Sequence, residues 1–247
     1  MTGICHDIVG TDGLAFSPGV TEKDKLWLFN DQLCRSIWLT YDEKVKVKGI
    51  TALKFTPPAS VFSFSNPDNY CYCPDIRECA VKDGQTWNLA ACERCVDGII
   101  SLEGCQGVPV IMSTPHFLDG DRRLWEAIDG LQPVREEHVT YLSLEPLSGM
   151  PLKAHKKIQI SLPVSQSDKF DCLNNVLSQM NYTQSELVFP LAWVDEGADL
   201  DDDNAKKAKK LLVTPFIAVD AVTGILIAIG GLMMIGSVLW CLKSKLC

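Results

Sequence analysis

"KKIQISLPV", residues 156–164, alternates polar and apolar side chains along most of its length. Successive side chains of an extended strand point to opposite faces of a sheet, so a period of two collects the apolar ones on one face. In this stretch that face consists of Ile158, Ile160, Leu162 and Val164. We therefore predict a half-buried antiparallel strand whose apolar face packs on the core.

Further stretches of the same kind predict a mostly β domain. "KVKVKGITALKF" (44–55) alternates on both sides of Gly49, where we expect a β-bulge. "GVPVIMSTPHF" (107–117) and "HVTYLSLEP" (138–146) are β-rich runs that each end near a proline. The chain has 247 residues, of which 47% are hydrophobic, and this is enough apolar surface for a buried core.

One long apolar segment predicts a membrane span. From Val219 to Leu242 the sequence is apolar apart from Asp220, Thr223 and Ser237. At a rise of about 1.5 Å per residue, a helix of this length crosses a hydrocarbon core of about 30 Å. A buried helix of a soluble core is the alternative, and it is disfavoured because such helices rarely run this far without a polar stripe.

The position of the predicted membrane span divides the chain into four segments. We expect an ectodomain (residues 1–205), a juxtamembrane stalk (206–218), a transmembrane helix (219–242) and a short cytosolic tail (243–247). The acidic stretch "DEGADLDDDN" (195–204) is interpreted as a solvated connector, followed by lysines that begin the stalk.

The cysteines indicate on which side of the membrane the large domain lies. Eight of the eleven fall between Cys5 and Cys105, and Asn181 begins an Asn-Tyr-Thr glycosylation sequon, so both features indicate an oxidising exterior. Residues 1–20 contain no secretory signal, and lysines stand on both sides of the span, so read literally the chain is tail-anchored with a cytosolic domain. We expect instead a carboxy-terminal fragment whose upstream anchor or signal delivers it outside.

No group of residues predicts catalysis, a cofactor or a metal site. The four histidines, at positions 6, 116, 138 and 155, stand in no His-Glu-x-x-His helix and beside no nucleophile motif. "REEH" (135–138) sets acids next to an imidazole, but a polar turn entering a strand explains it better than acid-base chemistry. The acids of 195–204 lack calcium-loop spacing. A net charge of −8 without a basic stripe argues against nucleic-acid partners.

Three uses compete for the clustered cysteines. Zinc prefers matched Cys-x-x-Cys or Cys/His knuckles, whereas this region has Cys71-x-Cys73, a lone Cys79 and one Cys92-x-x-Cys95. A thioredoxin-like role for the last pair needs a strand before it and a helix after it, but the following residues indicate turn and strand. Structural disulfides are favoured, although spacing alone does not fix which cysteines pair.

Several stretches, in order along nearly the whole chain, resemble one protein family. They are "GTDG" (10–13), "CRSI" (34–37), "NPDNYCYC" (66–73), "GVPVIMSTPHF" (107–117), "IDGLQPVREEHVTYLSLEPLSGMPL" (128–152) and the terminal span. The sequence is similar to the class B scavenger receptors, the family of platelet glycoprotein IV, lysosome integral membrane protein and the insect sensory neuron membrane proteins. "NPDNYC" and the "IDGL" to "LSG" run are the specific parts of the match.

The resemblance implies an architecture. Family members have a membrane helix at each end, short cytosolic tails and a large glycosylated exterior domain. That domain resembles an irregular antiparallel β-barrel with short helices, which encloses a hydrophobic tunnel for lipid. The match begins partway through this domain, in agreement with the expected truncation.

The resemblance also implies roles for individual cysteines. By motif, Cys5 pairs with Cys71, Cys34 with Cys105, and Cys73 with Cys95. A bridge between Cys79 and Cys92 is our own hypothesis, because these two remain as a pair. Cys172 is then left as a buried apolar residue or a free thiol. Cys241 and Cys247 flank the cytosolic boundary and are candidates for palmitoylation, and Asn181 for glycosylation.

From these observations we expect a plasma-membrane lipid receptor, with its ectodomain outside, that binds lipoprotein particles, fatty acids or other lipids. It takes them up through the tunnel without cofactor or covalent chemistry. A lysosomal sorting receptor for a partner enzyme, with a lysosomal location, is one alternative, and a phagocytic or adhesion receptor is another. The sequence leaves open whether the receptor forms a homo-oligomer.

Overall fold

The structure is a computed structural model that describes residues 7–73, 95–166, 174, 177 and 187–244. The chain divides into two compact units, and each is described by itself. The first contains residues up to 47 and 51–199, and the second contains 48–50 and 200–247.

The first unit is built on an eight-stranded sheet, in which β1–β2, β3–β6, β4–β5, β5–β7, β6–β7 and β7–β8 are antiparallel pairs. Its strands are β1 (Leu26–Asn30), β2 (Arg35–Val47), β3 (Ile50–Thr56), β4 (Ile99–Ser101), β5 (Ile111–Ser113), β6 (Tyr141–Leu144), β7 (Pro151–Val164) and β8 (Leu187–Asp199). The short helices between them are η2 (Ala59–Phe62), η3 (Pro67–Tyr72), α1 (Glu103–Gln106), η5 (Pro115–Phe117), α2 (Arg122–Glu126) and α3 (Arg135–His138).

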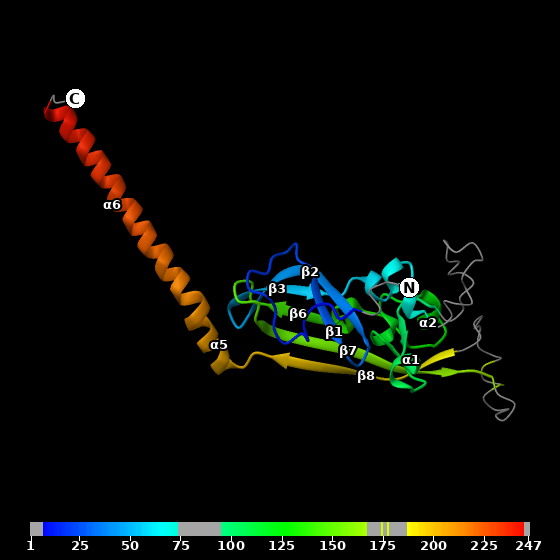
Figure 1. The fold of residues 1–247 in the computed structure, drawn as a ribbon. Helices are drawn as coiled ribbons and strands as arrows, with labels where there is room; N and C mark the ends of the chain where they lie inside the picture. The colour runs from blue at the N-terminus through cyan, green and yellow to red at the C-terminus, as the bar shows by residue number, and fades with distance from the viewer. Residues whose placement is uncertain (1–6, 74–94, 167–173, 175–176, 178–186, 245–247) are drawn as a thin grey trace. The chain divides into compact units, whose positions relative to one another are not determined.

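Strand β7 is the centre of this sheet (Figure 1). Along one edge it pairs first with β6 and then with β5, and along the other edge it pairs with β8 over almost its whole length. The remaining strands follow in the order β1-β2-β3-β6 on one side, and β4 follows β5 on the other. The prediction of a mostly antiparallel β domain with short helices is confirmed.

The described strands form an open sheet and do not close into a barrel. Among the named strands that the structure describes, β1 pairs with β2 alone and β4 pairs with β5 alone. Closure requires the two edges to meet with a regular stagger, and here β7 instead branches the sheet by pairing with three strands. The implied barrel is therefore corrected to an open, branched sheet over these residues.

The apolar face predicted for β7 is only partly buried. Ile160 and Leu162 are 38% and 36% exposed, while the polar neighbours Gln159 and Ser161 are 1% and 0% exposed. The strand prediction is confirmed, but the face was assigned wrongly at these positions. The reason is that Gln159 has hydrogen-bond partners inside the protein, so burying it carries no unsatisfied amide.

One other local prediction is also wrong. Gly49 does not form a bulge, because Lys48 and Gly49 are the two residues of the tight turn between β2 and β3. Both have positive φ, 50° and 79°, as a type I′ hairpin turn requires, and glycine adopts this conformation without a Cβ clash.

The acidic stretch 195–204 is largely solvent-exposed, as predicted, but it forms regular secondary structure and not a simple connector. Its first half is the end of β8, where Glu196 and Asp199 pair with lysines of β7, Lys156 at 2.9 Å and Lys153 at 3.3 Å. Cross-strand pairs of opposite charge stabilise such a ribbon. Further along, Asp201 caps the next helix, accepting a hydrogen bond from the Asn204 backbone N–H at 2.8 Å.

Buried apolar side chains form core clusters that join the strands of this sheet. One cluster joins β1, β2, β3 and β6 through Leu26, Leu39, Leu53, Phe55, Leu142 and Leu144. A second joins β2, β4 and β5 through Leu33, Ile37, Trp38, Val61, Ile100, Leu102 and Met112. These clusters hold the strands that line the site described below.

The second unit contains the predicted membrane span. Its helices are α5 (Asp202–Ala208), the π-helical η6 (Lys209–Val213) and α6 (Thr214–Ser244). Residues 222–240 of α6 are long and apolar enough to cross a membrane, and none of this window is buried inside the protein. Within the same unit the Lys48 ammonium contacts the Asp202 carboxylate at 2.6 Å.

Candidate lipid-binding cavity

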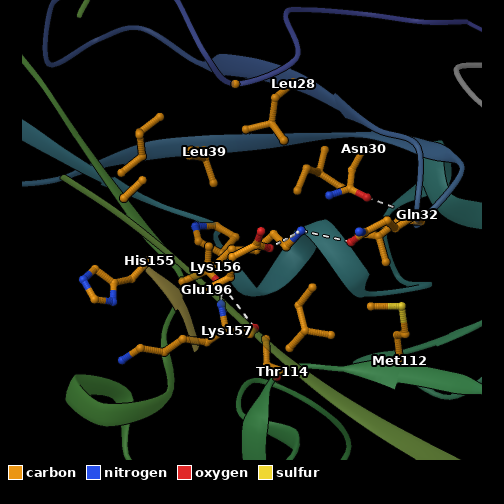
Figure 2. Close-up of a pocket in the computed structure, with 18 of the residues that line it drawn as sticks. Leu28, Asn30, Gln32, Leu39, Met112, Thr114, His155, Lys156, Lys157 and Glu196 are labelled. Atoms are coloured by element: carbon orange, nitrogen blue, oxygen red, sulfur yellow. Dashed lines mark hydrogen bonds and ion pairs between the residues drawn. The ribbon is translucent and has the colours of Figure 1, made fainter. Parts of the chain in front are cut away.

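A cavity of about 490 Å³ lies in the first unit (Figure 2). Its wall is mainly apolar and draws on seven strands. Strand β8 contributes Glu196, and the other six contribute apolar side chains that include Leu28, Leu39, Ile100, Met112, Leu142 and Ile158. Volumes of this order are typical of small-molecule sites, which are mostly apolar with a few placed polar groups. The strand pairing described above brings these residues together from positions far apart in the sequence.

One ammonium group extends into this wall. Lys156 Nζ donates hydrogen bonds to Gln32 Oε1 at 3.0 Å and to the Glu196 carboxylate at 2.9 Å (Figure 2). Gln32 lies in the turn after β1, so Lys156 connects that turn to the β7–β8 ribbon. The Glu196 side chain is largely exposed, and the ion pair is therefore screened and exchangeable.

The neighbouring Lys157 has a different environment. It is a buried residue, its Nζ donates to the Glu137 carbonyl oxygen, and its backbone N–H donates to Thr140 Oγ1 at 2.9 Å. Its charge is directed to α3 and so contributes less to the cavity than that of Lys156. The two adjacent lysines thus have separate structural roles.

His155 is held tightly at one end of the cavity. Its Nδ1 lies 2.8 Å from Asp195 Oδ1 and its Nε2 lies 3.3 Å from Asp199 Oδ1. The Tyr141 ring stacks on it with centroids 5.0 Å apart, and Gly197 stands opposite it in the strand register. Burial by itself would raise the pKa of Asp199, but the hydrogen bonds and charges of Lys153 and His155 outweigh burial and lower that pKa.

The cysteines that are described take part in disulfides. Cys34 is bonded to Cys105 and Cys73 to Cys95, with Cα–Cα distances of 6.2 and 5.2 Å. These are two of the three pairs that the resemblance implied, and they remove Cys73 and Cys95 from the zinc and redox alternatives, because a bonded sulfur is no thiolate. Cys71 is also disulfide-bonded. Its implied partner, Cys5, lies outside the described residues.

Several predicted sites lie where the structure gives no description. Cys79, Cys92, Cys172, Asn181 and Cys247 are outside the described residues. Cys241 belongs to α6, but its side chain is not among those described. Their predicted disulfide, glycosylation and palmitoylation roles stay predictions. Over the described part of the chain, no three His, Cys, Asp or Glu side chains are grouped to hold a metal ion.

Sequence reasoning named no residue of the cavity as a ligand contact. The polar groups it missed are Gln32, Lys156 and Glu196, of which Gln32 lies more than a hundred positions from the other two. The sequence shows that Lys156 begins the alternating run, but it does not show which residues Lys156 contacts, because these depend on the strand register. That register could not be read from the alternation pattern.

Comparison with known sequences identifies the family of this chain. The model of the CD36 family matches residues 1–241, and the chain belongs to that family. It is 31% identical over 243 residues to sensory neuron membrane protein 1 of Ostrinia furnacalis, covering 98% of this chain and 41% of the relative. It is 30% identical over 218 residues to lysosome membrane protein 2 of Homo sapiens, covering 88% of this chain and 41% of the relative.

These relatives are members of the class B scavenger receptors, so the resemblance stated from the motifs is confirmed. Sensory neuron membrane protein 1 of Apis mellifera is 32% identical over 212 residues, 86% of this chain and 36% of the relative. The chain thus spans about two fifths of the length of the relatives it matches. Their names are those of membrane proteins, with which the long apolar helix α6 is compatible.

Proposed function

We propose that this protein is a membrane receptor that binds an amphipathic lipid in the cavity and mediates its uptake toward the bilayer. The observation that carries the proposal is an apolar cavity of about 490 Å³ within a CD36-family chain that also has an apolar helix long enough to span a membrane. Fatty acids, and lipids drawn from lipoprotein particles, are the ligand classes proposed. No covalent step is needed.

The driving force is removal of apolar surface from water. Burial is favourable by about 25 cal/mol per Å², or about 0.8 kcal/mol for each CH₂ group, so an alkyl chain in contact with Leu28, Leu142 and Ile158 is stabilised along its length. A polar headgroup reaches Lys156 and Gln32, which can exchange their present partners for it. The cavity therefore accommodates the two ends of an amphiphile separately.

The proposed topology follows the segments predicted from the sequence. Residues 1–205 lie outside the cell at the plasma membrane, 206–218 form the stalk, 219–242 cross the bilayer and 243–247 are cytosolic. In this arrangement the disulfides Cys34–Cys105 and Cys73–Cys95 lie in an oxidising compartment, where such bonds persist.

Uptake of a fluorescent long-chain fatty acid by cells that express the full-length receptor tests the proposal. Ile158→Trp places an indole in the cavity, while Ile160→Trp is a matched control two residues along the same strand that does not line it. Displacing two methylene groups of the ligand costs about 1.6 kcal/mol, so we expect about a tenfold loss of affinity for the first variant. The control variant should keep wild-type uptake.

Equal surface expression of both variants is the condition for the comparison. If Ile158→Trp at wild-type surface levels takes up the fatty acid as well as the wild-type receptor, the cavity is not the lipid site and the proposal fails. Particle binding without uptake by the wild-type receptor would favour the adhesion alternative.

A lysosomal sorting receptor is the second candidate, because one relative is lysosome membrane protein 2. Immunofluorescence of the full-length protein with lysosomal and plasma-membrane markers distinguishes the two. Exclusive lysosomal staining would replace the cell-surface assignment.

A further inference from the structure

Two histidine rings from separate elements lie stacked beside the cavity. His116 in η5 and His138 at the end of α3 have ring centroids 4.2 Å apart and planes inclined by 22°. His138 is only 4% exposed, and the Trp193 ring of β8 meets it edge-on at 5.8 Å. His138 is thus a buried imidazole stacked on the half-buried ring of His116, and the hydrogen bonds of the pair define its charge state.

Both rings are neutral in this arrangement. Nδ1 of His116 accepts a hydrogen bond from the Gln132 backbone N–H at 3.0 Å, and Nδ1 of His138 accepts one from the Val134 backbone N–H at 2.9 Å. A backbone N–H only donates, so neither Nδ1 carries a proton. In a protonated ring the Nδ1–H would face the backbone N–H, and the hydrogen bond would be lost because neither group is an acceptor.

The charges around the pair oppose a proton on His138. Lys157 of β7 and His116 of η5 both lower its pKa, after burial, which is the largest cause, while Glu137 of α3 raises it. The other nearby carboxylates have partners: Asp119 is 2.7 Å from Arg135, and Asp195, which faces Lys157 across the strands, is bonded to His155.

The segment that carries the pair has an unusual backbone conformation, although Phe117 and Leu124 anchor it in a core cluster and backbone hydrogen bonds support it locally. His116, Phe117 and Asp119 have positive φ values of 53°, 56° and 60°, a conformation that side chains other than glycine keep only when their surroundings impose it. Gln159 of β7 contributes by accepting the His116 backbone N–H at 2.9 Å. The segment begins and ends at the cavity, since Thr114 and Thr140 line it.

We propose that the stacked pair is an acid-sensitive latch: protonation of His116 or His138 breaks a backbone hydrogen bond, places a cation in the stack and loosens residues 114–139 from β7. The latch is independent of which lipid the cavity takes. Its effect is to loosen the cavity wall in an acidic compartment while leaving it closed at the neutral cell surface.

The sign follows from proton linkage. The pKa of His138 is lower in the closed state than its ordinary value of about 6.5, so the open state binds more protons and is favoured as the pH falls below that value. For one imidazole the opening equilibrium therefore rises between pH 7.4 and pH 5.0, by at most about 30-fold.

Hydrogen exchange on the full-length receptor in lipid nanodiscs tests the latch. After correction for the pH dependence of intrinsic exchange, we expect protection in 114–139 to fall at pH 5.0, by at most about 30-fold, while the β2–β3 hairpin keeps its protection. His116→Asn and His138→Asn each supply an oxygen acceptor that does not titrate, and they should reduce this acid response. His155→Asn is the matched control, because its ring is held by carboxylates, and it should leave the response unchanged.

Two results would overturn the proposal. One is wild-type protection of 114–139 that is the same at both pH values, and the other is an acid response that persists at full size in both asparagine variants. The titration of His138 followed by NMR of the wild-type protein serves if a variant does not fold. A midpoint at or above about 6.5 contradicts the latch, and a lower midpoint that coincides with the loss of protection supports it.

Discussion

The two faces of β7 differ in a way that its sequence does not suggest. On one face Gln159 and Ser161 are buried, and on the other Ile160 and Leu162 remain more than a third exposed. Simple alternation predicts the reverse, because burying an apolar side chain is favourable and burying a polar one is costly. The difference shows that burial here depends on available hydrogen-bond partners as well as on hydrophobicity.

On the polar face Gln159 has specific partners from distant elements, whereas the buried Ser161 hydroxyl has no hydrogen-bond partner among the described residues. Gln159 Oε1 accepts the backbone N–H of His116, and Gln159 Nε2 donates to Ser113 Oγ at 3.2 Å. These bonds join β7 to η5 and β5, and thus to the segment that carries the histidine pair. On the apolar face Ile158 packs against a core cluster, but Ile160 and Leu162 stay more than a third exposed. Two of the variants below, Gln159→Leu and Ile160→Thr, test how unequal the two faces are.

Gln159→Leu should have the largest effect. Leucine keeps the volume but leaves the His116 N–H and the Ser113 hydroxyl without this partner, at about 1–3 kcal/mol for each buried polar group. We expect a loss of about 2–4 kcal/mol in the free energy of unfolding, measured by chemical denaturation of the full-length protein in detergent. A variant as stable as the wild type would show that the buried amide is not what selects this face.

Gly197→Ala, in β8 opposite His155 of β7, should have an intermediate effect on stability. An added Cβ would lie 2.7 Å from the His155 ring, which has little freedom to move between Tyr141 and the carboxylates of Asp195 and Asp199. Overpacking of this kind costs about 1–2 kcal/mol, and the same denaturation assay measures it.

Gly104→Ala is the control for that variant. No atom lies within 4 Å of the Cβ it would add, so the methyl group meets open space. This substitution should leave the stability unchanged or raise it slightly, because alanine favours the helical backbone. If the two glycine variants lose equal stability, close packing at His155 is not the cause.

The extended segments could be predicted from the sequence. The runs 138–146 and 107–117 contain β6 and β5, and the run 156–164 is the second part of β7. The apolar run after Val219 likewise lies in α6. These features are local, and propensity and periodicity within a few residues determine them.

The cavity and the buried face could not be predicted in the same way. Which face of β7 is buried depends on Gln159 meeting Ser113, and the position of Lys156 depends on Gln32, 124 residues away. Gly49 illustrates the same limit on a smaller scale, because alternation on both sides of a glycine fits a bulge in one strand as well as a turn between two. Tertiary register decides each of these cases.

Of the two substitutions on β7, Ile160→Thr should have the smaller effect on stability, and it tests the comparison between the two faces most directly. Threonine keeps the β-branched shape, and the side chain it replaces is 38% exposed, so the unfolding free energy should change by no more than about 0.5 kcal/mol. The chain spans about two fifths of its relatives' length, so the experiment belongs on the full-length receptor. A loss above about 1.5 kcal/mol would mean that another part of the receptor covers this face. The two faces of β7 would then differ in which residues contact them and not in how exposed they are.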